Sequence, residues 1–229
     1  MYITINNQHN KKKIVIFGSG NQATVAAQEV LKSKKYSLDY FLDVKSKLKF
    51  KKINKIKFPI IADYKSLKKE KEPLGIIAIG HNYVRKTLYK TIKKNIPKIK
   101  WISLISEDSI IASDVKIFGG SIIMPGCILN SKSIIKSHVI INTGSIIEHD
   151  NFLDNFTSVG PGSILGGNVK VSSLSHIGIG SIVLQKIKVG TNSLLGAGSL
   201  LNKNIPKNSI YFGKPAKFIK LKSLNFNYL

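Results

Sequence analysis

From residue 111 to residue 201, every sixth position of the chain is aliphatic. An amphipathic helix has a period of 3.6 residues and a half-buried strand a period of 2, so neither explains this spacing. A six-residue repeat is typical of a parallel β-helix, in which short strands wind around an apolar axis. The series is Ile111, Ile117, Ile123, Leu129, Ile135, Ile141, Ile147, Leu153, Val159, Leu165, Val171, Ile177, Val183, Val189, Leu195 and Leu201.

The position two residues before each aliphatic is mostly small. Residues i and i−2 of a strand share a face, so this position also points inward. A narrow triangular coil holds one large and one small residue per side, so we expect three repeats per turn and stacked positions 18 residues apart. Eight glycines fall between the expected strands, where we expect corners with positive φ. They are Gly119, Gly126, Gly144, Gly160, Gly162, Gly178, Gly190 and Gly196.

The open ends of a solenoid expose its core, so each end needs a cap. About five coils fit into the repeat, and no insertion breaks its register. We expect the preceding domain to cover the first coil and the segment 204–220 to cover the last.

The first 100 residues predict a separate α/β domain. The buried strand pattern Lys12–Phe17 leads into G-x-G-x-x-A at 18–23 and a helix at 24–32, the layout that places a phosphate at a helix N-terminus. A second strand, Leu38–Leu42, ends at Asp43, whose carboxylate can accept from a ribose or a base. A third strand at 74–79 precedes a helix at 83–94.

This domain has room for only half of a dinucleotide-binding fold, so a mononucleotide or nucleotide-sugar fits better. The alternative that the glycines only make a tight turn remains open. We therefore expect a Rossmann-like α/β domain at 1–100 and an all-β parallel β-helix with a C-terminal cap at 101–229.

The net charge of +24 is concentrated in the first domain, where 24 Lys/Arg stand against 6 Asp/Glu. A basic balance can indicate nucleic-acid or membrane binding. No nucleic-acid motif is present, however, and Arg85 is the single arginine, so we expect neither partner. Cys127 is the single cysteine, which excludes an internal disulfide and suits a cytoplasmic location. No apolar run is long enough to predict a membrane-spanning helix.

Among five histidines, His149 has the most informative neighbours. It stands between Glu148 and Asp150, and an adjacent carboxylate raises imidazole basicity and orients the ring, which suits a general base. Gly167 lies 18 residues later, one coil above, where a glycine leaves space for a ligand. The alternative is a solvated histidine in an acidic corner.

A zinc site of three histidines is the other chemistry known in β-helix proteins. His138, His149 and His176 fall on different phases of the repeat, so we expect no metal. His9 lies in a polar N-terminal stretch and carries no prediction.

The chain resembles bacterial sugar O-acyltransferases of the sialic-acid O-acetyltransferase type. Within that group it is most similar to N-acetyltransferases of nucleotide-linked 4-amino-sugars, as in bacillosamine synthesis. The resemblance covers nearly the whole chain. It rests on IVIFGSGNQA, YFLD, IIAIGHN with Arg85, IIMPGCILN, IINTGSIIEHD, GPGSILGGNVKV, IGIGSIVL and FGKPAK.

The resemblance implies a cytoplasmic enzyme for surface glycan or glycoprotein synthesis. It implies a homotrimer of left-handed β-helices, with acetyl-CoA between neighbouring helices. It also implies that the first domain binds a nucleotide-sugar, which we expect to be UDP-linked. The implied catalytic residues are His149 as general base, Asp150, Asn142 and Glu148. The implied acetyl-CoA residues are Gly167, whose N–H faces the thioester oxygen, Ile179, Ala197 and Ser158. The implied substrate residues are Gly20, Asn21, Gln22, Asp43, Val44 and Gly80.

Three departures from the family pattern leave parts of this assignment open. Relatives often carry a histidine where this chain has Ser158, a G-G-H-G turn in place of Asn21-Gln22-Ala23, and two acids in place of Asp43-Val44. Three alternatives also stay open: an O-acetyltransferase acting on a sialic-acid-like hydroxyl, a non-catalytic nucleotide-binding scaffold and a nucleic-acid binder.

Overall fold

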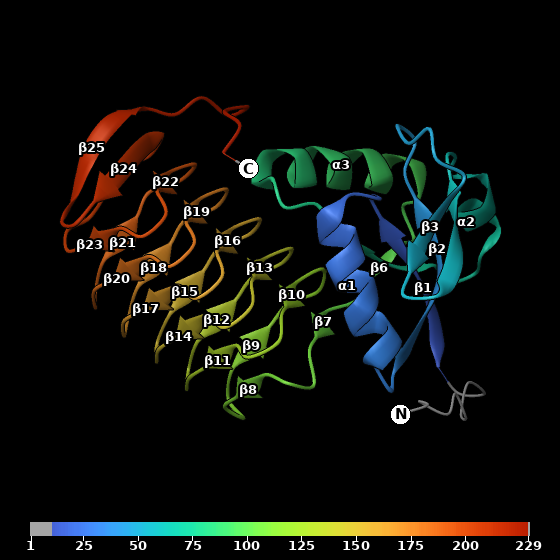
Figure 1. The fold of residues 1–229 in the computed structure, drawn as a ribbon, viewed down its shortest axis with the longest axis horizontal. Coiled ribbons are helices and arrows are strands. Elements are labelled where there is room, and N and C mark those ends of the chain that lie inside the picture. Colours follow the sequence, from blue (N-terminus) through green and yellow to red (C-terminus); the bar gives the residue numbers. More distant parts are fainter. Residues whose placement is uncertain (1–10, 229) are drawn as a thin grey trace.

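A computed structural model describes residues 11–228 of the chain (Figure 1). The first domain is a six-stranded sheet in the order β3-β4-β2-β1-β5-β6, parallel except for the β3–β4 hairpin. Its strands are β1 (Lys12–Phe17), β2 (Tyr36–Leu42), β3 (Phe50–Ile53), β4 (Ile56–Ile61), β5 (Leu74–Ile77) and β6 (Lys100–Trp101). Its helices are α1 (Asn21–Lys32), α2 (Lys65–Lys69) and α3 (Asn82–Asn95).

The predicted strand–turn–helix order of this domain is confirmed, and its pairings explain why. The apolar run of β1 is central in the sheet, between β2 and β5. Ile14 and Ile16 pack into one core and Val15 and Phe17 into the other, so both faces are covered and the strand is continuously apolar. The hairpin of β3 and β4 was not predicted. Its lysines occupy exposed or half-exposed positions beside buried apolar residues. The segment therefore has the composition of a polar loop.

The second domain is a parallel β-helix with three faces, consistent with the left-handed form. Face 1 contains β7 (Leu104–Ile105), β10 (Ile122–Ile123), β13 (Ile140–Ile141), β16 (Ser158–Val159), β19 (His176–Ile177) and β22 (Leu194–Leu195). Face 2 contains β8 (Ile110–Ile111), β11 (Ile128–Leu129), β14 (Ile146–Ile147), β17 (Ile164–Leu165), β20 (Ile182–Val183) and β23 (Leu200–Leu201). Face 3 contains β9 (Lys116–Ile117), β12 (Ile134–Ile135), β15 (Phe152–Leu153), β18 (Lys170–Val171) and β21 (Lys188–Val189).

Each strand pairs in parallel with the residues 18 positions away, as predicted; Ile128, for example, pairs with Ile146. The aliphatic series fills the interior, and its members from Ile123 to Leu201 are at most 1% exposed. The small residues two positions earlier are also buried. Several of their hydroxyls donate to backbone carbonyls 15 residues later, as Ser163 does to Gly178.

From residue 120 to residue 198, every corner turns through one residue with positive φ, and this residue recurs at every sixth position. The φ values lie between 56° and 84°. The prediction that glycine marks these corners is only partly right. Gly126, Gly144 and Gly162 occupy such positions, but the other five predicted glycines do not.

Glycine is needed at some of the remaining sites because the coils are close together. A Cβ on Gly160 would lie 2.6 Å from the amide nitrogen of Ile179, and one on Gly178 would lie 2.6 Å from that of Ala197. Close approach of the next coil, and not backbone handedness, therefore selects glycine at these two positions.

The first domain lies beside the β-helix along face 1 (Figure 1). The outward side chains of Leu104, Ile122 and Ile140 are buried there. The inward Ile111 and Ile117 of the first coil stay half-exposed. The preceding domain was predicted to cover this end, but it covers a flank instead.

The opposite end has the predicted cap. The hairpin of β24 (Ser209–Gly213) and β25 (Ala216–Leu221) extends face 1, and Ile205 closes the last coil. The chain then returns to the start of α3 (Figure 1).

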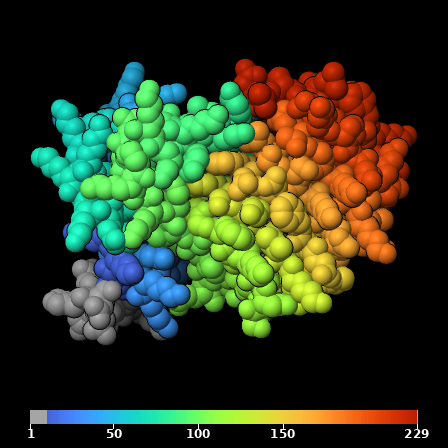
Figure 2. All heavy atoms as spheres, turned by 180° about the vertical axis from the view of Figure 1, so that it is seen from behind, coloured from blue at the N-terminus to red at the C-terminus, as the bar shows by residue number. Residues whose placement is uncertain are grey.

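Arg85 of α3 joins the two domains and is fully buried. Its guanidinium donates to the carbonyl oxygens of Ile79 and Gly80 in the first domain. It also donates to those of His138 and Thr157 in the β-helix, at 2.9 and 3.0 Å. Burial lowers the pKa of Arg85 to about 10, so it keeps its charge at neutral pH. Figure 2 shows the resulting contact between the α3 region (green) and the middle coils (yellow to orange).

The corner between faces 3 and 1 packs under α3, and three of its positive-φ residues are large: His138, Phe156 and Leu174. His138 is stacked on Phe156, one coil above, with ring centroids 5.0 Å apart. Tyr89 of α3 contacts both rings. His138 is 2% exposed, and its Nδ1 has no partner among residues 11–228. Burial first, and Arg85 second, lowers the pKa of His138 to about 3.

This shifted pKa predicts that stability falls with acidification. The unfolded histidine takes up a proton near pH 6.5 and the folded one does not, so each pH unit below 6.5 costs about 1.4 kcal/mol. We expect His138→Phe, which keeps the stacked ring, to remove about 2 kcal/mol of the stability lost between pH 7.5 and pH 5.0. Urea unfolding at both pH values measures this. Equal losses in the variant and the wild type would contradict it.

Candidate active site

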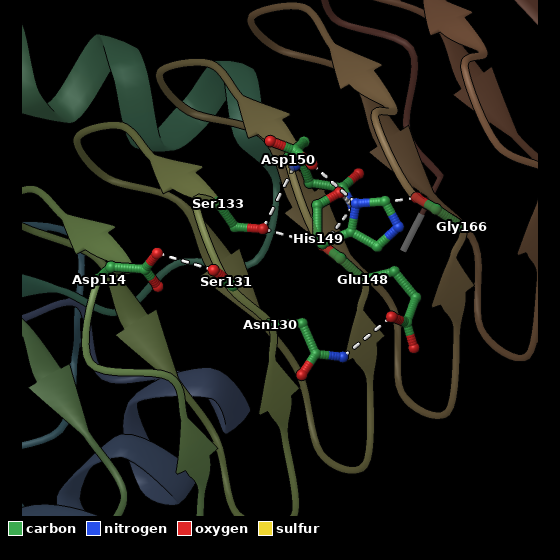
Figure 3. Close-up of polar contacts among 9 residues, drawn as sticks. Asp114, Asn130, Ser131, Ser133, Glu148, His149, Asp150 and Gly166 are labelled. Atoms are coloured by element: carbon green, nitrogen blue, oxygen red, sulfur yellow. Dashed lines mark hydrogen bonds and ion pairs between the residues drawn. The ribbon is translucent and has the colours of Figure 1, made fainter.

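His149 and Asp150 form a hydrogen-bonded pair at the corner between faces 2 and 3 (Figure 3). The imidazole Nδ1 lies 2.8 Å from Asp150 Oδ2, and the His149 side chain is 62% exposed. Asp150 is the positive-φ corner residue, with φ of 58°, which turns its carboxylate back towards the ring. A carboxylate accepts the Nδ1 proton, so the lone pair of Nε2 is free on the solvent side. This tautomer suits a general base.

Glu148 does not contact the imidazole. Its Oε2 accepts from Asn130 Nδ2 at 3.0 Å, one coil below (Figure 3). Of the two acidic neighbours in the sequence, only Asp150 therefore contacts the ring. The reason is strand alternation, which sends the side chains of residues 148 and 149 in different directions. The buried Asn151 holds the corner by donating to the carbonyls of Glu148 and Gly166.

Gly167 lies one coil above His149, as predicted. The space that its missing side chain leaves is, however, already filled. A Cβ on Gly167 would lie 2.6 Å from both Nε2 and Cε1 of His149, so the ring itself occupies that space. The flanking amides of Gly166 and Asn168 donate to Val183 and His149. The N–H of Gly167 has no acceptor within the described part of the chain, so it is available beside the imidazole.

A second group of predicted residues lines a pocket of about 430 Å³ between the first domain and the β-helix. It lies on face 1 and on the corner between faces 1 and 2. Neither His149 nor Gly167 belongs to it. The predicted residues that line it are Gln22, Gly80, Asn142, Ser158, Ile179 and Ala197.

Two stacked glycines, Gly178 and Gly196, and two stacked polar residues, Ser158 and His176, shape the β-helix wall of this pocket. Ile179 and Ala197 follow Gly178 and Gly196 on adjacent coils, and Ile179 is 56% exposed. Asn142 is fixed because its Nδ2 donates to Val159 O at 2.8 Å.

His176 is a pocket residue that the sequence did not reveal. It stands one coil above Ser158, and its Nδ1 lies 2.7 Å from Ser158 Oγ. Burial, with Arg85 and Lys222 nearby, lowers its pKa to about 3, so the ring is neutral at physiological pH. The 18-residue coil alone could have indicated the pair, because 158 + 18 is 176.

The glycine-rich turn and Asp43 meet at the edge of the first sheet. Asp43 Oδ2 accepts from the backbone N–H and the hydroxyl of Ser19, at 3.0 and 2.7 Å. The carboxylate therefore holds the turn in place. Lys51 of β3 reaches the same turn, with its Nζ 2.8 Å from Ser19 O. Asp43 therefore contacts the glycine-rich turn through its side chain. Its neighbour Val44 is 46% exposed and makes no such contact.

The N-terminus of α1 is open beside this turn. Gly20 is the N-cap, no side chain caps the helix, and no acid stands in its first turn, which begins at Asn21. A Cβ on Gly20 would meet nothing within 4 Å. Free helix amides with a nearby lysine can bind a phosphate group.

The remaining histidines lie apart. His138 is under α3, His149 is on another corner, and His9 lies outside the described residues. Within residues 11–228, no three His, Cys, Asp or Glu side chains lie close enough to hold a metal ion. None of the helices described is long and apolar enough to cross a bilayer.

Residues 13–92 match the family of the PglD N-terminal domain. The fold of the whole chain matches the acetyltransferase domain of PglB from Neisseria gonorrhoeae FA1090, with 26% identity and a TM-score of 0.80 over 90% of this chain and 99% of that one. It also matches PerB from Caulobacter crescentus, solved with CoA and GDP-perosamine, with 23% identity and a TM-score of 0.82 over 91% and 98%. No curated protein sequence matches the chain significantly.

These matches confirm the predicted resemblance and the predicted two-part fold. The family match covers the strand–turn–helix of the first domain, and the structural matches extend over the β-helix.

The contact between Gly167 and His149 predicts the effect of one added methyl group. We expect Gly167→Ala to displace the His149 ring and to break its Nδ1 contact with Asp150, while the coil stays folded because residue 167 lies on the outside. A crystal structure of the variant and its melting temperature measure the two effects. A ring unmoved against Asp150 would contradict the prediction.

Proposed function

We propose that this protein is an acetyl-CoA-dependent N-acetyltransferase that acts on the amino group of a nucleotide-linked amino-deoxy sugar. The observation that carries the proposal is the His149–Asp150 pair, with a free Nε2 beside the free N–H of Gly167. A base and an N–H donor at adjacent positions match the two needs of acyl transfer, proton removal and stabilisation of an oxyanion. The PglB domain and PerB, which match in fold, are bound to acetyl coenzyme A and to CoA with GDP-perosamine in their solved complexes.

Within one chain this pair and the pocket lie on different corners, separated by face 2. The outer residues of face 2 are all aliphatic: Ile110, Ile128, Ile146, Ile164, Ile182 and Leu200. Ile110 is 68% exposed, and face 3 carries lysines at its corresponding positions 116, 170 and 188. An unpartnered apolar face of this kind supports a subunit interface.

We propose a homotrimer in which face 2 turns towards the axis. A ring of identical subunits brings one corner of a subunit against the other corner of its neighbour. Each active site would then combine His149 of one subunit with the pocket of the next.

The positive-φ residues of the pocket-side corner support this arrangement. All five, from residue 126 to residue 198, are glycine, whereas the His149-side corner uses Lys132, Asp150, Asn168 and Lys186. A Cβ on Gly144, Gly162, Gly180 or Gly198 would meet nothing within 4 Å inside the chain. Other corners carry side chains at the same φ, so the backbone does not require glycine here. The row of glycines forms a ridge without side chains, and this supports close approach by another molecule. Ile179 and Ala197 precede two of these glycines, so the acetyl-CoA arm would lie along the ridge.

In the proposed reaction the sugar amine attacks the thioester carbonyl. The new C–N bond forms, His149 Nε2 takes the amine proton, and Asp150 stabilises the imidazolium. The Gly167 N–H donates to the oxyanion, and the C–S bond then breaks as the imidazolium returns a proton to the leaving thiolate. Asn142 would orient the amine. We assign no step to Glu148, because Asn130 binds its carboxylate.

The first domain would hold the nucleotide part of the acceptor. The open N-terminus of α1 suits its phosphates, and Gln22 and Gly80 reach from this domain into the pocket. We propose a UDP-linked acceptor in a cytoplasmic step of surface glycan or glycoprotein synthesis. The PerB complex contains a GDP-linked sugar, so GDP- and dTDP-linked sugars are the comparison substrates.

Thiol release from acetyl-CoA tests this function across UDP-, GDP- and dTDP-linked 4-amino-sugars and free sialic acid. We expect turnover with a nucleotide-linked amine, and His149→Ala should lower it by about 10²–10⁴-fold, the usual contribution of a general base. Lys132→Ala is the matched control, because residue 132 occupies the Asp150 position one coil below.

Two results would contradict the proposal. Turnover with sialic acid alone would replace it with O-acetylation. Near-normal turnover of a folded His149→Ala protein would remove the general base.

A further inference from the structure

The C-terminal segment of the chain reaches the pocket of about 430 Å³. After β25 the chain crosses back to the start of α3 (Figure 1). Tyr228 lines the pocket together with Gln22 and Gly80. No motif in the sequence singled out Tyr228, because it lies beyond the repeat and 146 residues from its partner Asn82.

The ring of Tyr228 is fixed between two histidines that come from different domains. His81, at the start of α3, is stacked on one side at 4.6 Å, with 28° between the ring planes. His176 of the β-helix is also stacked on it, at 4.7 Å and 30°. The phenol ring is therefore packed against one histidine from each domain.

The hydroxyl and backbone of this segment are also held. The Asn82 N–H donates to the Tyr228 hydroxyl at 2.9 Å, and His81 Nε2 donates to Phe226 O at 2.9 Å. His81 Nδ1 accepts from Val84 N–H, which agrees with a proton on Nε2. The segment is thus positioned by directed contacts in addition to burial.

Lys222 anchors the start of the segment to the β-helix. Its side chain is buried and its Nζ donates to Asn192 Oδ1 at 2.7 Å, while the same Nζ lies 5.3 Å from the centroid of the Tyr228 ring. The anchor and the ring contacts leave Tyr228 little freedom, so a ligand in the pocket meets a preformed wall.

The pocket wall around Tyr228 contains no acidic side chain. Arg85 and Lys222 lie close behind it, and burial raises the pKa of the Tyr228 hydroxyl, so it stays a neutral phenol. Ser158 contacts His176, and His176 is stacked on the Tyr228 ring. A largely apolar wall with a few neutral polar groups, and with positive charge behind it, suits a sugar joined to a diphosphate.

We propose that Tyr228 is a specificity-determining residue that completes the sugar subsite of the acceptor pocket. It ties the nucleotide-binding domain to the β-helix across the pocket and holds Ser158 and His176 in place beside the sugar. The proposal rests on the function proposed above. Nucleotide contacts at the N-terminus of α1 do not involve this residue, so its effect is confined to the sugar part.

The test compares Tyr228→Ala, Tyr228→Phe and the control Leu224→Ala, which changes an exposed residue of the same segment outside the pocket. The readouts are KM for the preferred nucleotide-sugar, KM for acetyl-CoA, kcat, and calorimetric Kd for the free nucleoside diphosphate. We expect Tyr228→Ala to raise KM for the sugar about tenfold or more, since about 1.4 kcal/mol of lost contact is tenfold in affinity.

Tyr228→Phe, which keeps the stacked ring, should recover most of this loss. The other three quantities should stay within about threefold of wild type, and Leu224→Ala should change none of them. A uniform fall in kcat with KM unchanged, or equal effects on sugar and free nucleotide, would overturn the proposal. A wild-type protein without turnover on any nucleotide-sugar would instead refute the proposed function and, with it, this assignment.

Discussion

The left-handed backbone turn at every sixth residue is the constraint on which the structure depends. It closes each side of the coil after one short strand, so that three sides return the chain to the same column after 18 residues. One extra residue would move every later aliphatic side chain off the axis. The regular recurrence of this turn from residue 120 to residue 198 keeps Ser158 under His176 and His149 under Gly167.

The same constraint divides the chemistry among corners. The corner under α3 has large residues at three of its turning positions, His138, Phe156 and Leu174, and it binds the first domain. The corner on the pocket side has only glycine, and the third has polar residues with the His149–Asp150 pair. Arg85 fixes the first domain against one side of this frame through backbone carbonyls of both domains. Gln22 and Gly80 consequently reach the same pocket as Asn142.

Much of the fold could be predicted from the sequence because its causes are local. The aliphatic period gives the coils, and the Gly-rich turn between a buried strand and a helix gives the start of the first domain. The β3–β4 hairpin was not predicted, because its many lysines give two half-buried strands the composition of a polar loop. The glycine corners were only partly right, because Lys132, His138 and Phe156 also adopt positive φ when the flanking strands fix the turn.

The site was harder to predict, because its contacts cross coils and domains. The pairing of His149 with Asp150 follows from adjacency, but the direction of Glu148 depends on Asn130 one coil away. The contribution of Tyr228 depends on how the last residues of the chain return to His81. The group that fills the space beside Gly167 depends on the orientation of the His149 ring, which the sequence does not give.

The central claim is that the corner bearing His149 and the pocket of one chain serve different active sites, which neighbouring subunits complete. Subunit complementation tests it most directly, with His149→Ala chains refolded together with Ala197→Trp chains, whose pocket is blocked. Each parent should be inactive, and random mixing should restore about a quarter of the wild-type turnover, because one in four sites combines an intact histidine with an intact pocket. Turnover of the mixture that stays at the level of the parents would contradict the account.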